Sequence, residues 1–96
     1  MSIFLSGCVK KEAPQTIKES AIKLCIEKCK DALNSGINLT NGPCLSNRII
    51  EDWVCDVAHW PRQEVDNLKE NQCPSYGKEA NHFVEVNPNC ELIRAI

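Results

Sequence analysis

The chain has few aromatic side chains, no long apolar run and no excess of positive charge, and each absence excludes a class of protein. Phe, Trp and Tyr make up only 5% of the 96 residues, so the core will be modest. No apolar run approaches the roughly 20 residues that a membrane-spanning helix needs. The net charge is −2, with Lys and Arg scattered along the chain, which argues against nucleic acid as a partner.

Familiar catalytic motifs are also missing. The chain has no GxSxG, no HExxH and no glycine loop of the kind that cradles phosphate. We therefore predict that it is not an enzyme and uses no cofactor. Its length, with 43% hydrophobic and 25% charged residues, suits one globular domain. A domain this small often needs covalent staples in addition to its apolar core.

Cysteine is abundant, with seven in the chain. Such density predicts a disulfide framework if the chain is exported to an oxidising compartment. Seven is odd, so one cysteine must stand apart. With Cys8 set aside, an even six remain to form three disulfides: Cys25, Cys29, Cys44, Cys55, Cys73 and Cys90. Spacing along the chain does not choose among their possible pairings.

A structural zinc site is the alternative use of these side chains. The spacings Cys-x3-Cys and Cys-x3-His supply a set of three thiolates and one imidazole, namely Cys25, Cys29, Cys55 and His59. This hypothesis describes an intracellular zinc-stabilised interaction domain with no lipid anchor. It leaves the other cysteines without a role, so we prefer disulfides.

The stretch Leu5–Cys8, LSGC, resembles the lipobox of surface lipoproteins, in which two small residues precede a Cys that becomes lipidated. The resemblance implies that residues 1–7 are the remnant of a signal peptide, that Cys8 carries lipid, and that 8–15 form a tether. It places the domain, 16–96, at the extracellular face of the cell membrane, with the membrane as a partner through the lipid.

The clearest expected element is a helix over residues 17–34. Apolar residues recur there at three- and four-residue spacing. Thr16 followed by Glu19 has the pattern of a capping box, and Gly36 is a stop signal. Residues 37–47 are rich in Asn, Gly, Pro and Ser and read as a loop, in which Asn38 begins a glycosylation acceptor pattern.

The second half of the chain predicts strands. Residues 48–60 fit a helix or a strand, and β-branched and aromatic residues favour a strand over 53–59. Residues 61–81 read as a long loop that Cys73 ties down. Residues 82–86 and 91–95 read as a hairpin. The fold class is therefore α+β, with a long N-terminal helix packed on a small antiparallel sheet and stapled by disulfides.

The most distinctive polar and aromatic cluster is the stretch CDVAHWPR, which contains Asp56. Together with the last strands it gives these possible binding residues: His59, Trp60, Arg62, His82 and Glu85. We expect a small binding or structural module whose contact surface includes the long loop and whose ligand is a surface protein or a glycan. The alternative is a small hydrolase or metal-dependent enzyme that uses His59, His82 and Glu85.

The stretches WVCDVAHWPR and NHFVEV resemble small Cys-rich domains of uncharacterised archaeal surface proteins. This resemblance implies no activity.

Overall fold

The structure, a computed structural model, describes residues 16–96, and its first element is helix α2, Ile17–Asn34. The capping box is confirmed: the Glu19 amide donates to the Thr16 hydroxyl (3.0 Å), and the Thr16 amide donates to the Glu19 carboxyl (2.9 Å). Gly36, at φ +84°, follows the helix end. No helix within 16–96 is long and apolar enough to cross a membrane. The predicted leader, lipidated Cys8 and tether lie outside the described residues.

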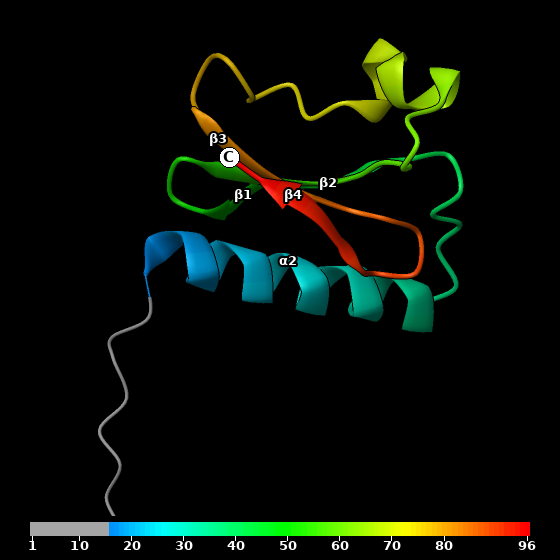
Figure 1. The fold of residues 1–96 in the computed structure, drawn as a ribbon, viewed down its shortest axis with the longest axis horizontal. Coiled ribbons are helices and arrows are strands. Elements are labelled where there is room, and N and C mark those ends of the chain that lie inside the picture. Colours follow the sequence, from blue (N-terminus) through cyan, green and yellow to red (C-terminus); the bar gives the residue numbers. More distant parts are fainter. Residues whose placement is uncertain (1–15) are drawn as a thin grey trace, which may run out of the picture.

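Four strands form one sheet in the order β1-β2-β3-β4, which confirms the α+β class (Figure 1). Their bounds are β1 Cys44–Ile50, β2 Trp53–Val57, β3 His82–Val86 and β4 Leu92–Ala95. The β1/β2 and β3/β4 pairs are antiparallel, and the second of these is the predicted hairpin. The expectation of a wholly antiparallel sheet was wrong, because β2 and β3 run parallel. A parallel pair requires a long crossover, and residues 58–81 supply it.

Strand β1 was missing from the sequence prediction, which gave residues 37–47 to a loop. The loop ends instead at Pro43, and β1 begins at Cys44. Polar residues at the middle of β1 hid the strand, and they are tolerated because β1 is an edge strand with exposed Asn47 and Arg48. The strand interpretation of 53–59 is confirmed over Trp53–Val57, so the helical alternative for 48–60 was wrong.

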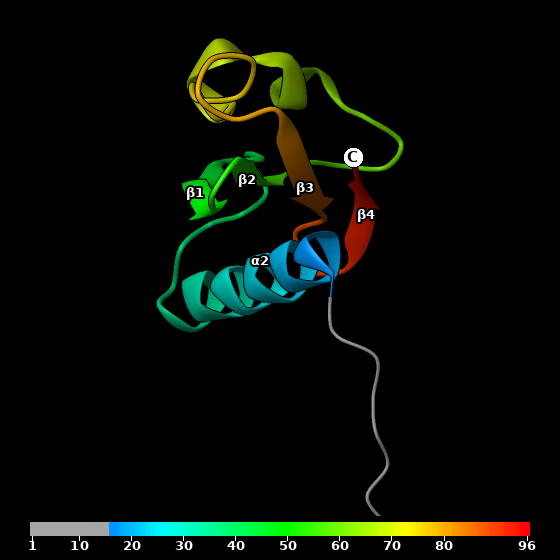
Figure 2. The ribbon, with the colours of Figure 1, turned by 90° about the vertical axis from the view of Figure 1, so that its left-hand side faces the viewer.

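The two faces of the sheet pack against different parts of the chain. The inner face carries Cys55, Val57, Val84 and Val86 and packs on α2 in the main apolar core. The outer face carries the alternate residues Val54, Asp56, Phe83 and Glu85. Residues 61–80, here called the outer segment, cover that face with two short 3-10 turns, Glu64–Asn67 and Lys69–Asn71. Figure 2 shows α2 and the outer segment on opposite sides of the sheet.

Three disulfides connect these layers: Cys25–Cys55, Cys29–Cys90 and Cys44–Cys73. The first two join α2 to the sheet and to the β3–β4 turn. The third ties the outer segment to β1, as expected for Cys73. The zinc hypothesis was wrong, because the three cysteines that it required, Cys25, Cys29 and Cys55, all form disulfides. Within residues 16–96, no cluster of three or more His, Cys, Asp or Glu could hold a metal ion.

Candidate ligand-binding site on the outer face of the sheet

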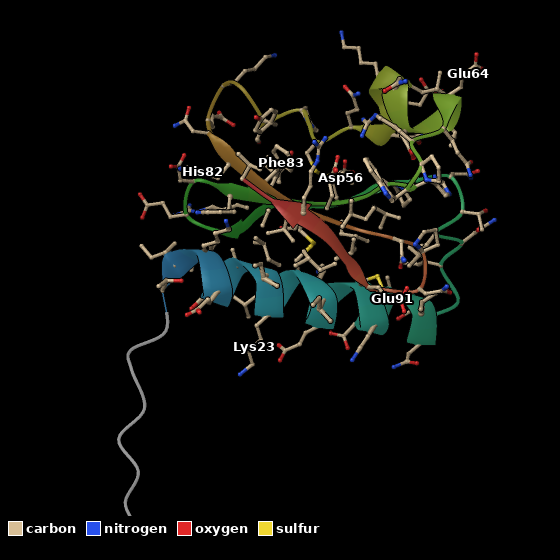
Figure 3. The ribbon with its side chains drawn as sticks, viewed as in Figure 1. Lys23, Asp56, Glu64, His82, Phe83 and Glu91 are labelled. Carbon is tan, nitrogen blue, oxygen red and sulfur yellow. A yellow bond between two sulfur atoms is a disulfide. The ribbon has the colours of Figure 1, made fainter. Side chains whose placement is uncertain are left out.

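A cavity of about 310 Å³ lies between the outer face of the sheet and the outer segment. This volume is at the lower end of the range for small-molecule sites. Figure 3 shows Asp56 and Phe83 on the side of the sheet away from α2. Strands β2, β3 and β4 and the outer segment all contribute to the lining: Val54, Asp56, Arg62, Gln72, Cys73, Tyr76, Phe83, Glu85 and Arg94.

Glu85 is a buried carboxyl group held by two arginines. Its side chain is only 8% exposed. Arg62 Nη1 donates to one of its oxygens (3.1 Å), and Arg94 Nε donates to the other (2.9 Å). Arg94 comes directly opposite Glu85 in the antiparallel register of β3 and β4. These charge-assisted hydrogen bonds offset the cost of removing the Glu85 carboxylate from water.

Asp56 is the neighbour of Glu85 on β2, at the same register position, and it has no such support. Its Oδ1 atom is buried and has no hydrogen-bond partner among the described residues. Burial first, and then the charge of Glu85, raise the pKa of Asp56 to about 8, while Arg62 opposes the shift. The carboxyl group is therefore protonated at neutral pH. An unsatisfied buried polar atom in a cavity wall is uncommon and requires an explanation.

Aromatic side chains form another part of the lining. The rings of Tyr76 and Phe83 meet edge to face, with centroids 5.3 Å apart. The Arg94 guanidinium lies 5.3 Å from the Phe83 ring centre. Tyr76 is 47% exposed, so its ring stands at the mouth of the cavity. The site thus offers apolar ring faces next to carboxyl, guanidinium and amide groups.

Asp66 holds the outer segment in place beside this cavity. It is 3% exposed and accepts hydrogen bonds from the backbone amides of His59 (2.9 Å) and Gln63 (3.0 Å) and pairs with His59 Nδ1 (2.8 Å). Burial raises the pKa of Asp66, but the hydrogen bonds from Gln63 and His59 outweigh it, so the net shift is downward. Gly42 makes room for this carboxyl: a Cβ there would lie 2.6 Å from Asp66 Oδ1.

The structure separates the predicted binding residues. Arg62 and Glu85 meet in the cavity wall. His59 is bound to Asp66 beneath the outer segment, and Trp60 is 76% exposed. His82 lies on the opposite face of β3 from Glu85, because residues three apart on a strand alternate sides.

The surroundings of His82 agree with that placement. Its ring stacks on Trp53 at 4.7 Å, and its Nε2 lies 3.4 Å from the Asp52 carboxyl group. The histidines and Glu85 therefore have three different sets of partners, and the structure does not bring them together as the hydrolase alternative required.

Sequence reasoning missed Asp66, Tyr76, Phe83 and Arg94. A usable signal existed for Phe83, since it alternates with the inner residues His82 and Val84 and shares its face with Glu85. No local pattern marks Tyr76, because only the crossover brings the outer segment over the sheet. The Asn38 side chain accepts a hydrogen bond from the Thr40 hydroxyl on an exposed turn. Glycosylation at Asn38 stays a prediction.

No family model, curated protein or solved structure matches the chain.

Proposed function

We propose that this protein is a small ligand-binding module and that the outer-face cavity is its binding site. The observation that carries the proposal is the Asp56 carboxyl oxygen, which is buried in the cavity wall and has no hydrogen-bond partner within residues 16–96. Leaving a buried polar group unsatisfied costs about 1–3 kcal/mol. A ligand that hydrogen-bonds to Asp56 removes that cost, so the cavity gains more from an occupant than a fully satisfied surface would.

The proposed location is the extracellular face of a membrane. Three disulfides are consistent with an oxidising environment. They use six of the seven cysteines and leave Cys8, within the lipobox-like LSGC, as the proposed site of lipidation. Intact mass spectrometry of the protein from membranes of its native host tests the anchor. We expect a lipid mass on Cys8, and an unmodified Cys8 would contradict it.

Binding is tested by backbone amide NMR spectra recorded with soluble saccharides, amino acids, nucleosides and dicarboxylates. We expect at least one of these classes to shift amide signals of Asp56, Phe83 and Tyr76. Asp56→Asn keeps the side-chain size but removes the acid, and should weaken the response. Asp31→Asn makes the same change on the exposed face of α2 and should leave it unaltered. If no class shifts the cavity signals, the proposal fails.

The pair Asp56 and Glu85 favours acid–base catalysis as a second candidate function. Glycoside hydrolysis uses a protonated carboxyl together with an ionised one, and Asp56 and Glu85 supply these two forms. It ranks second because both Glu85 oxygens are engaged by arginines. Product release from soluble glycosides, abolished by Asp56→Asn, would support catalysis. Saturable binding without turnover would leave the protein as a binding module.

A further inference from the structure

The cavity adjoins a second hollow. This hollow, about 320 Å³ in volume, lies beside strand β4 and is lined by Trp60, Asn87, Glu91, Leu92, Ile93 and Arg94. Arg94 lines both spaces. Because one side chain forms part of each wall, the two spaces are neighbours. The two spaces together suit a chain-like ligand better than a compact one.

Trp60 gives the second hollow a flat apolar wall. It is 76% exposed, and Leu92 beside it in the lining is 45% exposed. Tryptophan is usually well buried, and exposed apolar groups rimmed by polar ones often mark binding surfaces. The polar rim here is Asn87, Glu91 and Arg94. An exposed indole face so placed is suited to stacking on a ring of the ligand.

The polar groups of the cavity bear on the class of ligand. At neutral pH Asp56 is protonated, so one carboxylate, Glu85, faces two guanidinium groups, Arg62 and Arg94, and accepts a hydrogen bond from each. A simple cation gains nothing from such a lining. A hydroxyl group donates and accepts hydrogen bonds at once, so it satisfies Asp56 and Arg94 alike. Sugar rings combine such hydroxyls with apolar C–H faces that match Tyr76, Phe83 and Trp60.

We propose that the cavity and the second hollow together bind a saccharide chain. One sugar lies in the cavity against Asp56, the next stacks on Trp60, and Arg94 lies between them. The inference rests on the proposed function of the cavity and adds the ligand class and a second subsite. An extended peptide is the competing occupant, because β4 is an edge strand of the sheet that residues 16–96 form. A peptide paired along that edge would leave the buried Asp56 oxygen unsatisfied, so the saccharide is favoured.

The experiment is titration of the full chain with neutral monosaccharides and tetrasaccharides of hexoses and N-acetylhexosamines, followed by NMR and calorimetry. We expect the best tetrasaccharide to bind about tenfold more tightly than its monosaccharide, a difference of about 1.4 kcal/mol, because a second sugar stacks on the Trp60 ring. Trp60→Ala should remove most of that advantage and leave monosaccharide affinity unchanged. Asp56→Asn should weaken both ligands.

The control variant is Ile37→Ala, which truncates an exposed apolar side chain outside both hollows. It should bind as the wild type does. Thermal melts check that both variants are folded. Because Trp60 and Ile37 are exposed, their truncation should leave the melting temperature nearly unchanged.

The other outcomes separate the two proposals. Equal affinity for monosaccharide and tetrasaccharide, unaffected by Trp60→Ala, would overturn the second subsite. Binding of amino acids, nucleosides or dicarboxylates in the cavity, with no response to any saccharide, would overturn the saccharide class while the cavity remained a binding site. If a peptide shifted the amide signals of Leu92–Ala95 but not that of Asp56, the saccharide class would also be overturned. No binding by any class would contradict both proposals.

Discussion

The two faces of the sheet come from the same strands but differ in chemistry. On the inner face Val57, Val84 and Val86 are at most 1% exposed, and α2 covers them. On the outer face the intervening residues Asp56 and Glu85 are carboxylic acids beneath an irregular segment. A strand reverses its side chains at every residue, so one stretch of chain serves both purposes. The inner face stabilises the fold, whereas the outer face holds polar groups that cost stability and can bind.

The disulfides are divided in the same way. Two of them cross-link the inner layer, and one holds the outer segment. We therefore expect the inner layer to unfold only with the whole domain. The outer segment should open locally at a lower free energy, since short 3-10 turns and exposed loops replace a packed helix there.

Removing Cys29–Cys90 by the double change Cys29→Ala and Cys90→Ala should have the largest effect. The bond closes a sequence separation of 61 residues, so its loss should lower the free energy of unfolding by about 4 kcal/mol. Urea denaturation measures this, and hydrogen exchange should become faster throughout the domain. The matched change at Cys44 and Cys73 should accelerate exchange first in residues 61–80. If both variants accelerated exchange in the same regions, the two layers would not be distinct.

Truncating Asp66 should loosen the outer segment, although the Cys44–Cys73 disulfide still ties it to β1. Asp66→Ala leaves the His59 and Gln63 amides without their acceptor and should cost about 2–3 kcal/mol. Gly42→Ala should act in the same direction, because its Cβ would collide with the same carboxyl and Gly42 has φ +69°. Urea denaturation and amide exchange give the two readouts. If amide exchange became faster in α2 than in residues 61–80, the prediction that Asp66 holds the outer segment would be contradicted.

Asp56 should make stability fall as the pH rises. Folding raises its pKa from 3.8 to about 8, so its contribution is fully present below pH 4 and is lost as the pH rises through about 8. Asp56→Asn removes this dependence. At pH 9 the variant should therefore be more stable than the wild type by about 1–3 kcal/mol, with a smaller gap at pH 5. A gap that was constant with pH would show that Asp56 does not titrate in this range.

The sequence predicted local features well. Thr16 and Glu19 marked the start of α2 because a capping box depends on neighbouring residues alone. Setting Cys8 apart gave the correct set of six paired cysteines. The parallel pairing of β2 with β3 was missed, since it depends on where a long crossover lies in space. The binding site was predicted in part through Arg62 and Glu85. Tyr76 and Arg94 reach the same cavity only through the tertiary fold.

The central claim is that Asp56 lowers stability in order to bind a ligand. The most direct test is the melting temperature of wild type and Asp56→Asn at pH 8, each with and without the tetrasaccharide of the titration series that binds best. Without the saccharide, the variant should melt at the higher temperature. With it, the wild type should gain more, because a ligand that binds the folded state more tightly stabilises it more at the same concentration. A variant that melts lower without saccharide, or gains as much from it as the wild type, would contradict the account.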